Sequence, residues 1–159
     1  MNEPKKLIDT PSQTAGPFLH IGCAPRITGI NIFKIELGLT PFQDISDNEA
    51  INIKGKIYDG NGEPIIDAMI ETWQCDANGK YSSNQGFARI VTDFKTGEYQ
   101  LKTIRPGNKI NTDESLSASY ITFWIVARGM NRPLVTRMYF LENAVSYTHL
   151  TLPTRRGVV

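Results

Sequence analysis

Short apolar segments separated by turn signals fill residues 51–141, and this pattern limits the possible folds more than any other feature of the chain. In the first segment, apolar residues alternate with polar ones from Ile51 to Ile57, which is the two-residue period of a half-buried strand. No stretch has a helical period long enough for a crossover helix. The expected strands are residues 51–57, 65–73, 87–92, 98–104, 120–127 and 134–141. Six short strands with glycine-containing turns between them predict an all-β sandwich or barrel.

The segments on either side of this pattern are expected to differ from it. Residues 1–48 contain five prolines and no sustained period, which indicates an extended arm. Their apolar side chains, among them Phe18 and Ile32, are too many for a free chain, so we expect the arm to dock on the core or on a partner. We assign the sandwich core to residues 49–142. Residues 143–159 fit poorly with what precedes them, and we expect them to be a non-native tail.

Composition excludes several classes of protein. The 159 residues carry 17 basic and 16 acidic side chains, and a net charge of +1 argues against a nucleic-acid-binding protein. The two cysteines lack metal-ligand spacing and are too few for a disulfide scaffold, which favours a reducing compartment. The amino terminus lacks the apolar core of a signal peptide, and no apolar stretch could span a bilayer. We therefore expect a cytoplasmic protein that does not bind membranes.

The chain has few of the groups that metal sites require. Its two histidines are His20 and His149, so a histidine-rich metal site is nearly excluded. If Ile121 and its alternate neighbours face the core, then Tyr120 and Thr122 point together from the opposite face of the strand. Such a pair could present two ligands to a metal, but a surface or interface pair is the commoner outcome.

Three further features have both a functional and an ordinary interpretation. Tyr81 follows a turn and could be a phenolate ligand or a packing residue. Arg137 lies in an apolar segment, where a guanidinium either binds an anion or faces solvent. Residues 14–17 offer a hydroxyl and a glycine, which suits the close approach of a ligand but also a plain turn.

Several motifs, taken in chain order, are more specific than any one of them alone. They are Thr10-Pro-Ser-Gln-Thr-Ala-Gly-Pro-Phe18, Gly55-Lys-Ile-Tyr-Asp-Gly60, Ile70-Glu-Thr-Trp-Gln-Cys-Asp-Ala-Asn-Gly-Lys-Tyr81, Phe87-Ala-Arg89 and Thr103-Ile-Arg-Pro-Gly107. In this order they resemble the intradiol ring-cleaving dioxygenases, over residues 8–142. The resemblance implies a prealbumin-like β-sandwich with an N-terminal arm. It also implies that the family's last strands are missing here, so that the core is incomplete.

The ligands of the family's iron can be compared residue by residue. In that family, Fe(III) is held by two tyrosines and two histidines. By resemblance, Tyr81 matches the first tyrosine, whereas Asn108 and Lys109 stand near the second. Tyr120 and Thr122 stand where the family has its histidines. The resemblance therefore implies that this chain binds no metal and that Fe(III) is bound by a partner beta subunit in a hetero-oligomer.

The resemblance also implies roles at a pocket that the two subunits share. It places five arm residues against a small aromatic acid, which is cleaved with O2. These residues are Thr14, Ala15, Gly16, Pro17 and Phe18. Arg137 matches an arginine near the pocket and would position the acid. The alternatives are a non-catalytic, transthyretin-like binding module and a complete iron enzyme, and the latter needs ligands that the chain lacks.

Overall fold

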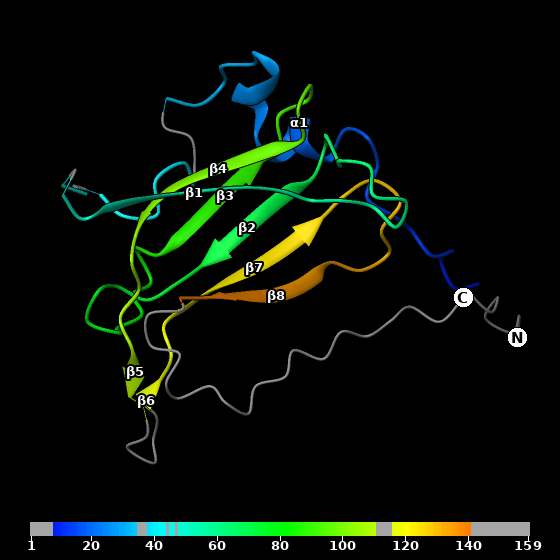
Figure 1. Cartoon of the computed structure of the whole chain (residues 1–159). Helices are drawn as coiled ribbons and strands as arrows, with labels where there is room; N and C mark the ends of the chain where they lie inside the picture. The colour runs from blue at the N-terminus through cyan, green and yellow to red at the C-terminus, as the bar shows by residue number, and fades with distance from the viewer. Residues whose placement is uncertain (1–7, 35–37, 44, 47, 111–115, 141–159) are drawn as a thin grey trace, which may run out of the picture.

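The computed structural model describes residues 8–34, 38–43, 45–46, 48–110 and 116–140, and its regular elements are almost all strands (Figure 1). The elements are α1 (Leu19–Cys23), η1 (Pro25–Thr28), β1 (Ala50–Lys56), β2 (Met69–Trp73), β3 (Phe87–Val91), β4 (Glu98–Ile104), β5 (Lys109–Ile110), β6 (Leu116–Ser117), β7 (Tyr120–Val126) and β8 (Leu134–Tyr139). The all-β class expected from the sequence is confirmed. Among the described residues, no helix combines the length and the apolar character needed to cross a membrane.

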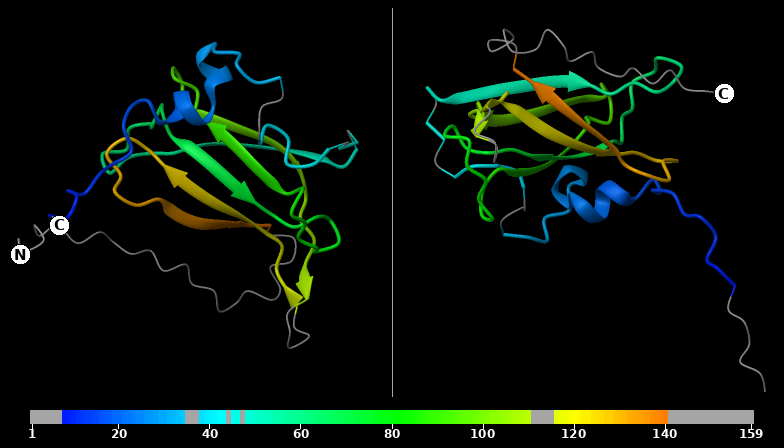
Figure 2. Two further views of the ribbon diagram at one scale, coloured as in Figure 1. Left: turned by 180° about the vertical axis from the view of Figure 1, so that it is seen from behind. Right: turned by 90° about the horizontal axis from the view of Figure 1, so that it is seen from below.

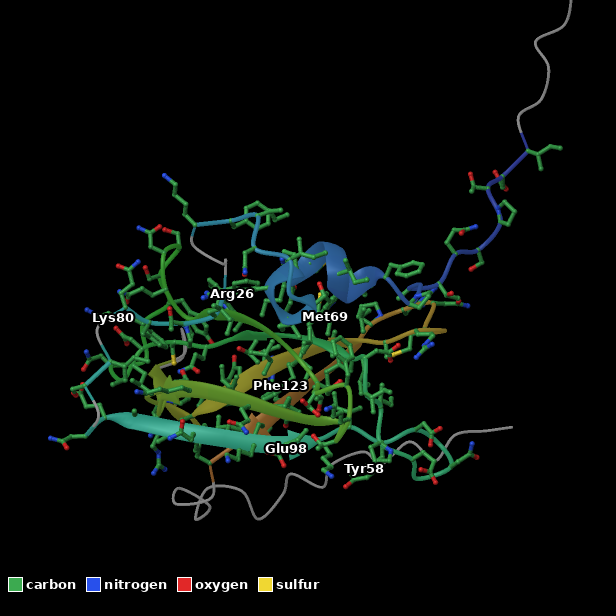
Figure 3. All side chains as sticks on the ribbon, turned by 90° about the horizontal axis from the view of Figure 1, so that it is seen from above. Arg26, Tyr58, Met69, Lys80, Glu98 and Phe123 are labelled. Carbon is green, nitrogen blue, oxygen red and sulfur yellow. The ribbon has the colours of Figure 1, made fainter. Side chains whose placement is uncertain are left out.

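Two antiparallel sheets form the layers of the sandwich. The larger sheet has the strand order β3-β2-β7-β8, and the smaller pairs β1 with β4. Figure 2 shows β1 on one side of the larger sheet and the arm with α1 on the other. The core between the sheets contains Ile70, Ala88, Ile90, Leu101, Ile121, Phe123 and Ile125. In Figure 3, the labelled Met69 lies towards the arm, whereas Phe123 lies between the sheets.

Strand β7 has the alternation that the sequence predicts. Ile121, Phe123 and Ile125 are buried in the core, with at most 8% of their surface exposed. Tyr120 and Thr122 are only half-buried, because they point to the outer face of the sheet. A shift of one residue in the register would expose the whole apolar set, so the core fixes which side chains reach the outer face.

The expected strand 65–73 begins only at Met69. The preceding residues pair with the end of β1 instead: the Ile65 N–H donates to the Ile57 carbonyl at 2.8 Å, and Tyr58 bridges Pro64. The segment between the expected strands 98–104 and 120–127 contains the additional short pair β5 and β6. The other expected strands agree with the structure within two residues at each described end.

A buried polar contact ties the end of β2 to β4. The Thr103 hydroxyl donates to Gln74 Oε1 at 2.7 Å, and Gln74 Nε2 donates to the Ile104 carbonyl at 2.9 Å. Gln74 and Thr103 are at most 1% exposed. A buried amide without its partners costs free energy, so this contact fixes how the two sheets are placed relative to each other.

The arm protects the outer edge of β3. The Arg89 N–H donates to the Gly38 carbonyl at 2.9 Å, and the Gly86 N–H donates to the Pro41 carbonyl at 2.6 Å. Gly38 has a φ of +84°, and a side chain there would meet the Arg89 backbone, so glycine allows this close approach. The loop thereby satisfies backbone groups that an open edge strand would leave unpaired.

The beginning of the arm covers part of the outer face of the larger sheet. Leu19 and Cys23 of α1 pack on a cluster that includes Met69 and Val126. The sequence predicts an irregular arm and misses α1, because a five-residue helix is too short to show a helical period. Residues 143–159, which we expect to be a non-native tail, lie outside the described residues.

Replacing Thr103 tests the polar contact between the sheets. Thr103→Val keeps the side-chain volume but leaves Gln74 Oε1 buried without its donor. We expect the free energy of unfolding to fall by about 1–3 kcal/mol, as measured by urea denaturation. Thr136→Val, at an exposed position of β8, is the matched control and should change it by less than about 0.5 kcal/mol. Equal losses in the two variants would contradict the role of the contact.

A second prediction concerns the turn between β3 and β4. The backbone N–H groups of Thr96 and Lys95 donate to Asp93 Oδ1 at 2.8 and 2.9 Å, which holds the pKa of Asp93 below its ordinary value. Because the pKa is lower in the folded state, the ionised carboxylate stabilises the fold above the unfolded pKa and loses this effect as pH falls. The stability difference between wild type and Asp93→Asn, measured by urea denaturation, should therefore shrink below about pH 4. A difference that does not change with pH would refute the prediction.

Candidate functional site

Two residues that we expect at the family's ligand positions, Tyr120 and Thr122, lie on the outer face of the larger sheet. Cross-strand pairing joins Trp73 to Thr122 and Thr122 to Arg137, so β2, β7 and β8 place them in one row. Tyr120 pairs with Tyr139 in the next row on that face. We call the following residues the tyrosine–arginine cluster: Trp73, Tyr81, Tyr120, Thr122, Arg137 and Tyr139. The register of the sheet brings together residues from three strands, and a ring contact adds Tyr81.

Tyr81 joins the cluster from the loop that follows β2. Asp76 shapes this loop, because its Oδ1 accepts the N–H groups of Asn78 and Lys80, each at 2.9 Å. The Tyr81 ring then stacks on Trp73, with ring centres 6.2 Å apart and planes 16° from parallel. Partial burial, followed by a hydrogen bond with Tyr120, raises the pKa of Tyr81 far above its ordinary value. Tyr81 is therefore a neutral phenol across the physiological range.

Arg137 is the cation of the cluster. Its guanidinium lies over the Tyr120 ring, 4.5 Å from the ring centre, and hydrogen-bonds to Tyr139. The Tyr120 and Tyr139 rings lie 5.8 Å apart. The hydrogen bond with Tyr139 raises the pKa of Arg137 further, so this side chain is permanently charged.

The donor chemistry of the cluster does not fit a ferric ion. By resemblance, Tyr120 and Thr122 stand in place of the family's two imidazoles. The charge of Arg137, above the Tyr120 ring, would repel a trivalent cation. In the part of the chain that the structure describes, no three His, Cys, Asp or Glu residues gather as a possible ligand set. The expectation that this chain binds no metal remains a prediction that its donor set favours.

The arm residues that we expect to bind substrate lie elsewhere. The Ala15 N–H donates to the Met130 carbonyl at 3.3 Å, and the Gly129 N–H donates to the Ala15 carbonyl at 3.1 Å. These contacts attach the arm to the turn between β7 and β8. The other arm residues that we expect to contact the substrate are Thr14, Gly16, Pro17 and Phe18, and all four are exposed. Phe18 has 73% of its surface exposed, which is unusual for an aromatic side chain.

Two ends of one sheet therefore carry the two groups of candidate residues. The arm contacts the turn that follows Val126, whereas Tyr120 lies at the start of the same strand. Six residues at about 3.3 Å each separate these positions by roughly 20 Å. Within this chain, the structure does not bring Arg137 into one pocket with residues 14–18. The role of Arg137 in positioning the acid remains a prediction.

Sequence reasoning missed two further residues. Trp73 belongs to the cluster because the register sets it beside Thr122, and only the pairing of strands could identify it. Arg128 lies next to Gly129, which bonds to the arm, and its side chain is 58% exposed and pairs with Asp67 at 2.7 Å. The turn that bonds to Ala15 is thus preceded by an arginine whose charge is paired with Asp67.

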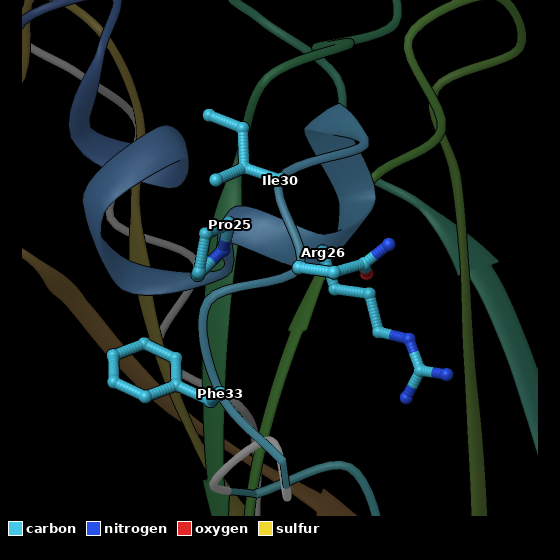
Figure 4. A pocket seen from close by; sticks show the side chains of 5 residues that line it. Pro25, Arg26, Ile30 and Phe33 are labelled. Carbon is cyan, nitrogen blue, oxygen red and sulfur yellow. The ribbon is translucent and has the colours of Figure 1, made fainter.

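Hollows elsewhere on the surface are lined neither by the tyrosine–arginine cluster nor by residues 14–18. One lies within the arm, at η1 and the loop that follows it, and is too narrow to hold a water molecule (Figure 4). It is lined by Pro25, Arg26, Ile30, Asn31 and Phe33. A second, of about 250 Å³, is lined by Thr40, Phe42, Gln43, Ile45 and Lys102. None of these residues is one of the expected site residues, so neither hollow replaces the two regions described above.

Comparisons with known proteins identify relatives of this chain. The family model described as Dioxygenase matches residues 36–157. The protocatechuate 3,4-dioxygenase alpha chain of Pseudomonas putida is 38% identical over 87% of this chain and 72% of its own length. The protocatechuate 3,4-dioxygenase beta chain of Burkholderia cepacia is 29% identical over 58% of this chain and 45% of its own length.

A solved structure supports the same fold. Catechol 1,2-dioxygenase from Pseudomonas arvilla C-1 superposes with a TM-score of 0.57 and 21% sequence identity. The similarity covers 65% of this chain but only 39% of that enzyme. At this identity the likeness concerns the fold, and it confirms the sandwich with the topology of these dioxygenases.

Proposed function

This chain belongs to the intradiol dioxygenase family, and we propose that it is the non-iron-binding alpha subunit of a protocatechuate 3,4-dioxygenase. Members of this family are iron-dependent oxidoreductases. The observation that carries the proposal is 38% identity with a protocatechuate 3,4-dioxygenase alpha chain over 87% of this chain. The donor set on β7, in which Tyr120 and Thr122 take the place of histidines, supports the same assignment.

The proposed partner is an iron-binding beta subunit. This chain is similar to a beta chain as well as to alpha chains, so the two subunits would share one fold. The assembled enzyme would use Fe(III) in the beta subunit and O2 to open the ring of protocatechuate between its hydroxyl-bearing carbons, giving 3-carboxy-cis,cis-muconate. Because the cluster on this chain does not suit iron, no step of the reaction takes place on it.

The contribution of this chain is to line the partner's pocket with its arm. Residues 14–18 are attached to the sheet by two backbone hydrogen bonds of Ala15, while the neighbouring side chains face outwards. The Thr14 hydroxyl and the bare backbone at Gly16 suit a ligand that approaches closely. The exposed Phe18 ring provides an apolar wall for an aromatic substrate.

A positive charge beside the arm suits a substrate that carries a carboxylate. Arg128, next to the turn that binds Ala15, is more than half exposed. A guanidinium in a pocket from which water is partly excluded attracts a carboxylate and fixes its direction. We propose that Arg128, which pairs with Asp67 through Nη2 but remains 58% exposed, presents its other N–H donors to the carboxylate at the arm.

Co-expression with an iron-binding beta chain tests the assignment. We expect the two chains to purify together, to show the visible absorption of ferric tyrosinate, and to consume O2 when protocatechuate is added. A beta chain that is equally active alone would refute the need for this subunit. Stoichiometric iron in this chain purified alone would refute the claim that it binds no metal. Failure to bind any beta chain would favour the transthyretin-like binding module.

A glycine substitution tests the role of the arm. A side chain added at Gly16 meets nothing within 4 Å in this chain, so Gly16→Val should leave its fold unchanged. If residues 14–18 line a shared pocket, the added methyl groups should lower kcat/KM of the co-expressed enzyme by about 10- to 100-fold. Gly60, in an exposed turn, is equally open and provides the control Gly60→Val, which should keep full activity. Full activity of Gly16→Val would remove the arm from the pocket.

A further inference from the structure

Asp67 pairs with Arg128 beside the turn that carries the arm. We propose that Asp67 is a positioning residue, which acts through Arg128 and this turn to hold residues 14–18 in place before a partner or a substrate binds. The inference rests on the proposed function, because it concerns the segment that would line the shared pocket.

The first argument is that Asp67 stands on a rigid base. Its neighbour Ala68 is fully buried, and so is Thr92, which directly follows β3. The Thr92 N–H donates to the Ala68 carbonyl, and the Ala68 N–H donates to the Thr92 hydroxyl, both at 3.0 Å. Buried polar contacts that are fully satisfied make a structure rigid. A group that bonds to the Asp67 carboxylate is therefore fixed relative to the sheet.

The second argument is that the ion pair is partly withdrawn from water. Arg128 Nη2 lies 2.7 Å from Asp67 Oδ2, and 9% of the Asp67 side chain is exposed, against 58% for Arg128. A fully exposed ion pair holds its side chains weakly, because water and salt screen it. A carboxylate with so little access to water instead needs a charged partner. Asp67 therefore holds Arg128 in one place, and with it the backbone of the turn.

The third argument is that the turn beside Arg128 binds one arm residue through both of its backbone groups. The Gly129 N–H donates to the Ala15 carbonyl at 3.1 Å, and the Ala15 N–H donates to the Met130 carbonyl at 3.3 Å. The turn is closed by the Met130 N–H, which donates to the carbonyl of the buried Ala127 at 3.1 Å. The exposed residues on either side of Ala15 therefore take their positions from this turn.

A second arginine holds the arm at the end of α1. Arg89 Nη1 donates to the Cys23 carbonyl at 3.3 Å, while its Nε and Nη2 donate to Glu71 Oε1. Leu19, between Ala15 and Cys23, packs on the apolar cluster of the outer face. With the end of α1 fixed in this way, a looser turn would free the segment around Ala15 and not the whole arm. The loss of the Asp67 charge should therefore act locally.

A preformed arm matters for binding. A pocket wall that is in place for only part of the time weakens the apparent affinity in proportion to that fraction. Without the Asp67 charge, the segment would have to be ordered when substrate binds, and this ordering costs free energy. In the proposed enzyme, KM would then rise while kcat stays the same, because only binding is affected.

Hydrogen exchange, followed by NMR in the full-length chain without a partner, tests the position of the arm. Asp67→Asn should speed the exchange of the Ala15 and Gly129 amides by about tenfold, whereas Asp67→Glu keeps the charge and should retain most of the protection. Glu63→Gln removes the same charge from an exposed turn, so it is the matched control and should exchange as wild type does. Unchanged exchange of the Phe123 amide in the core verifies that each variant is folded.

Salt provides a second measurement, which needs no substitution. The attraction between Asp67 and Arg128 is electrostatic, and Arg128 is more than half exposed. Raising NaCl from about 0.05 M to about 1 M should therefore speed exchange at Ala15 by about threefold or more in wild type, and hardly at all in Asp67→Asn. Equal exchange at Ala15 in the two proteins, or an equal response to salt, would overturn the inference.

Kinetics of the enzyme co-expressed with an iron-binding beta chain connect the arm to binding. Asp67→Asn should raise KM for protocatechuate by about threefold or more and keep kcat within about twofold, and Glu63→Gln should change neither. Faster exchange at Ala15 with an unchanged KM would refute a positioning role at the pocket. An inactive wild-type assembly would instead contradict the proposed function, and the exchange measurements would still decide whether Asp67 holds the arm.

Discussion

The burial of alternate residues of β7 is the constraint on which the rest of the structure depends. Ile121, Phe123 and Ile125 fill the centre of the core, and this fixes the register of β7 with β2 and β8. The same register decides that Thr122 lies between Trp73 and Arg137 on the outer face. A hydrophobic pattern thus places the polar and aromatic residues, although none of them contributes to the core.

The arm divides the outer face into two regions with different chemistry. Around Met69 and Val126, α1 covers the sheet and makes that end apolar and closed. The other end carries the tyrosine–arginine cluster, which the described part of the arm does not cover. The two ends of this face therefore differ in chemistry, since one is apolar and closed and the other carries the rings and the guanidinium of the cluster.

Contacts among the side chains of the cluster would hold these positions if, as we propose, this chain binds no metal. A ferric ion would draw tyrosine and histidine ligands together. Here Arg137 lies over Tyr120 and bonds to Tyr139, while Tyr81 bonds to Tyr120 and stacks on Trp73. Ring contacts, hydrogen bonds and one guanidinium charge hold the same positions in the sheet that the ligands would occupy.

Much of this could be predicted from the sequence, because its signals are local. The two-residue period predicted the strands and the inner face of β7. That Tyr120 and Thr122 stand at ligand positions follows from the family resemblance and stays a prediction. The start of β2 was predicted too early, because Ile65 pairs with β1 and local pattern does not reveal that partner. The helix α1 was missed because five residues carry no period.

What only the tertiary structure decided is which distant residues share a site. The sequence determined the fold class and the donor chemistry, since both follow from residue types and their spacing. It could not determine that Arg137 lies over Tyr120 in the cluster rather than at the arm, or that Gly129 and Met130 bond to Ala15. Those neighbours follow from strand order and register, which the burial of the whole core settles and no single segment encodes.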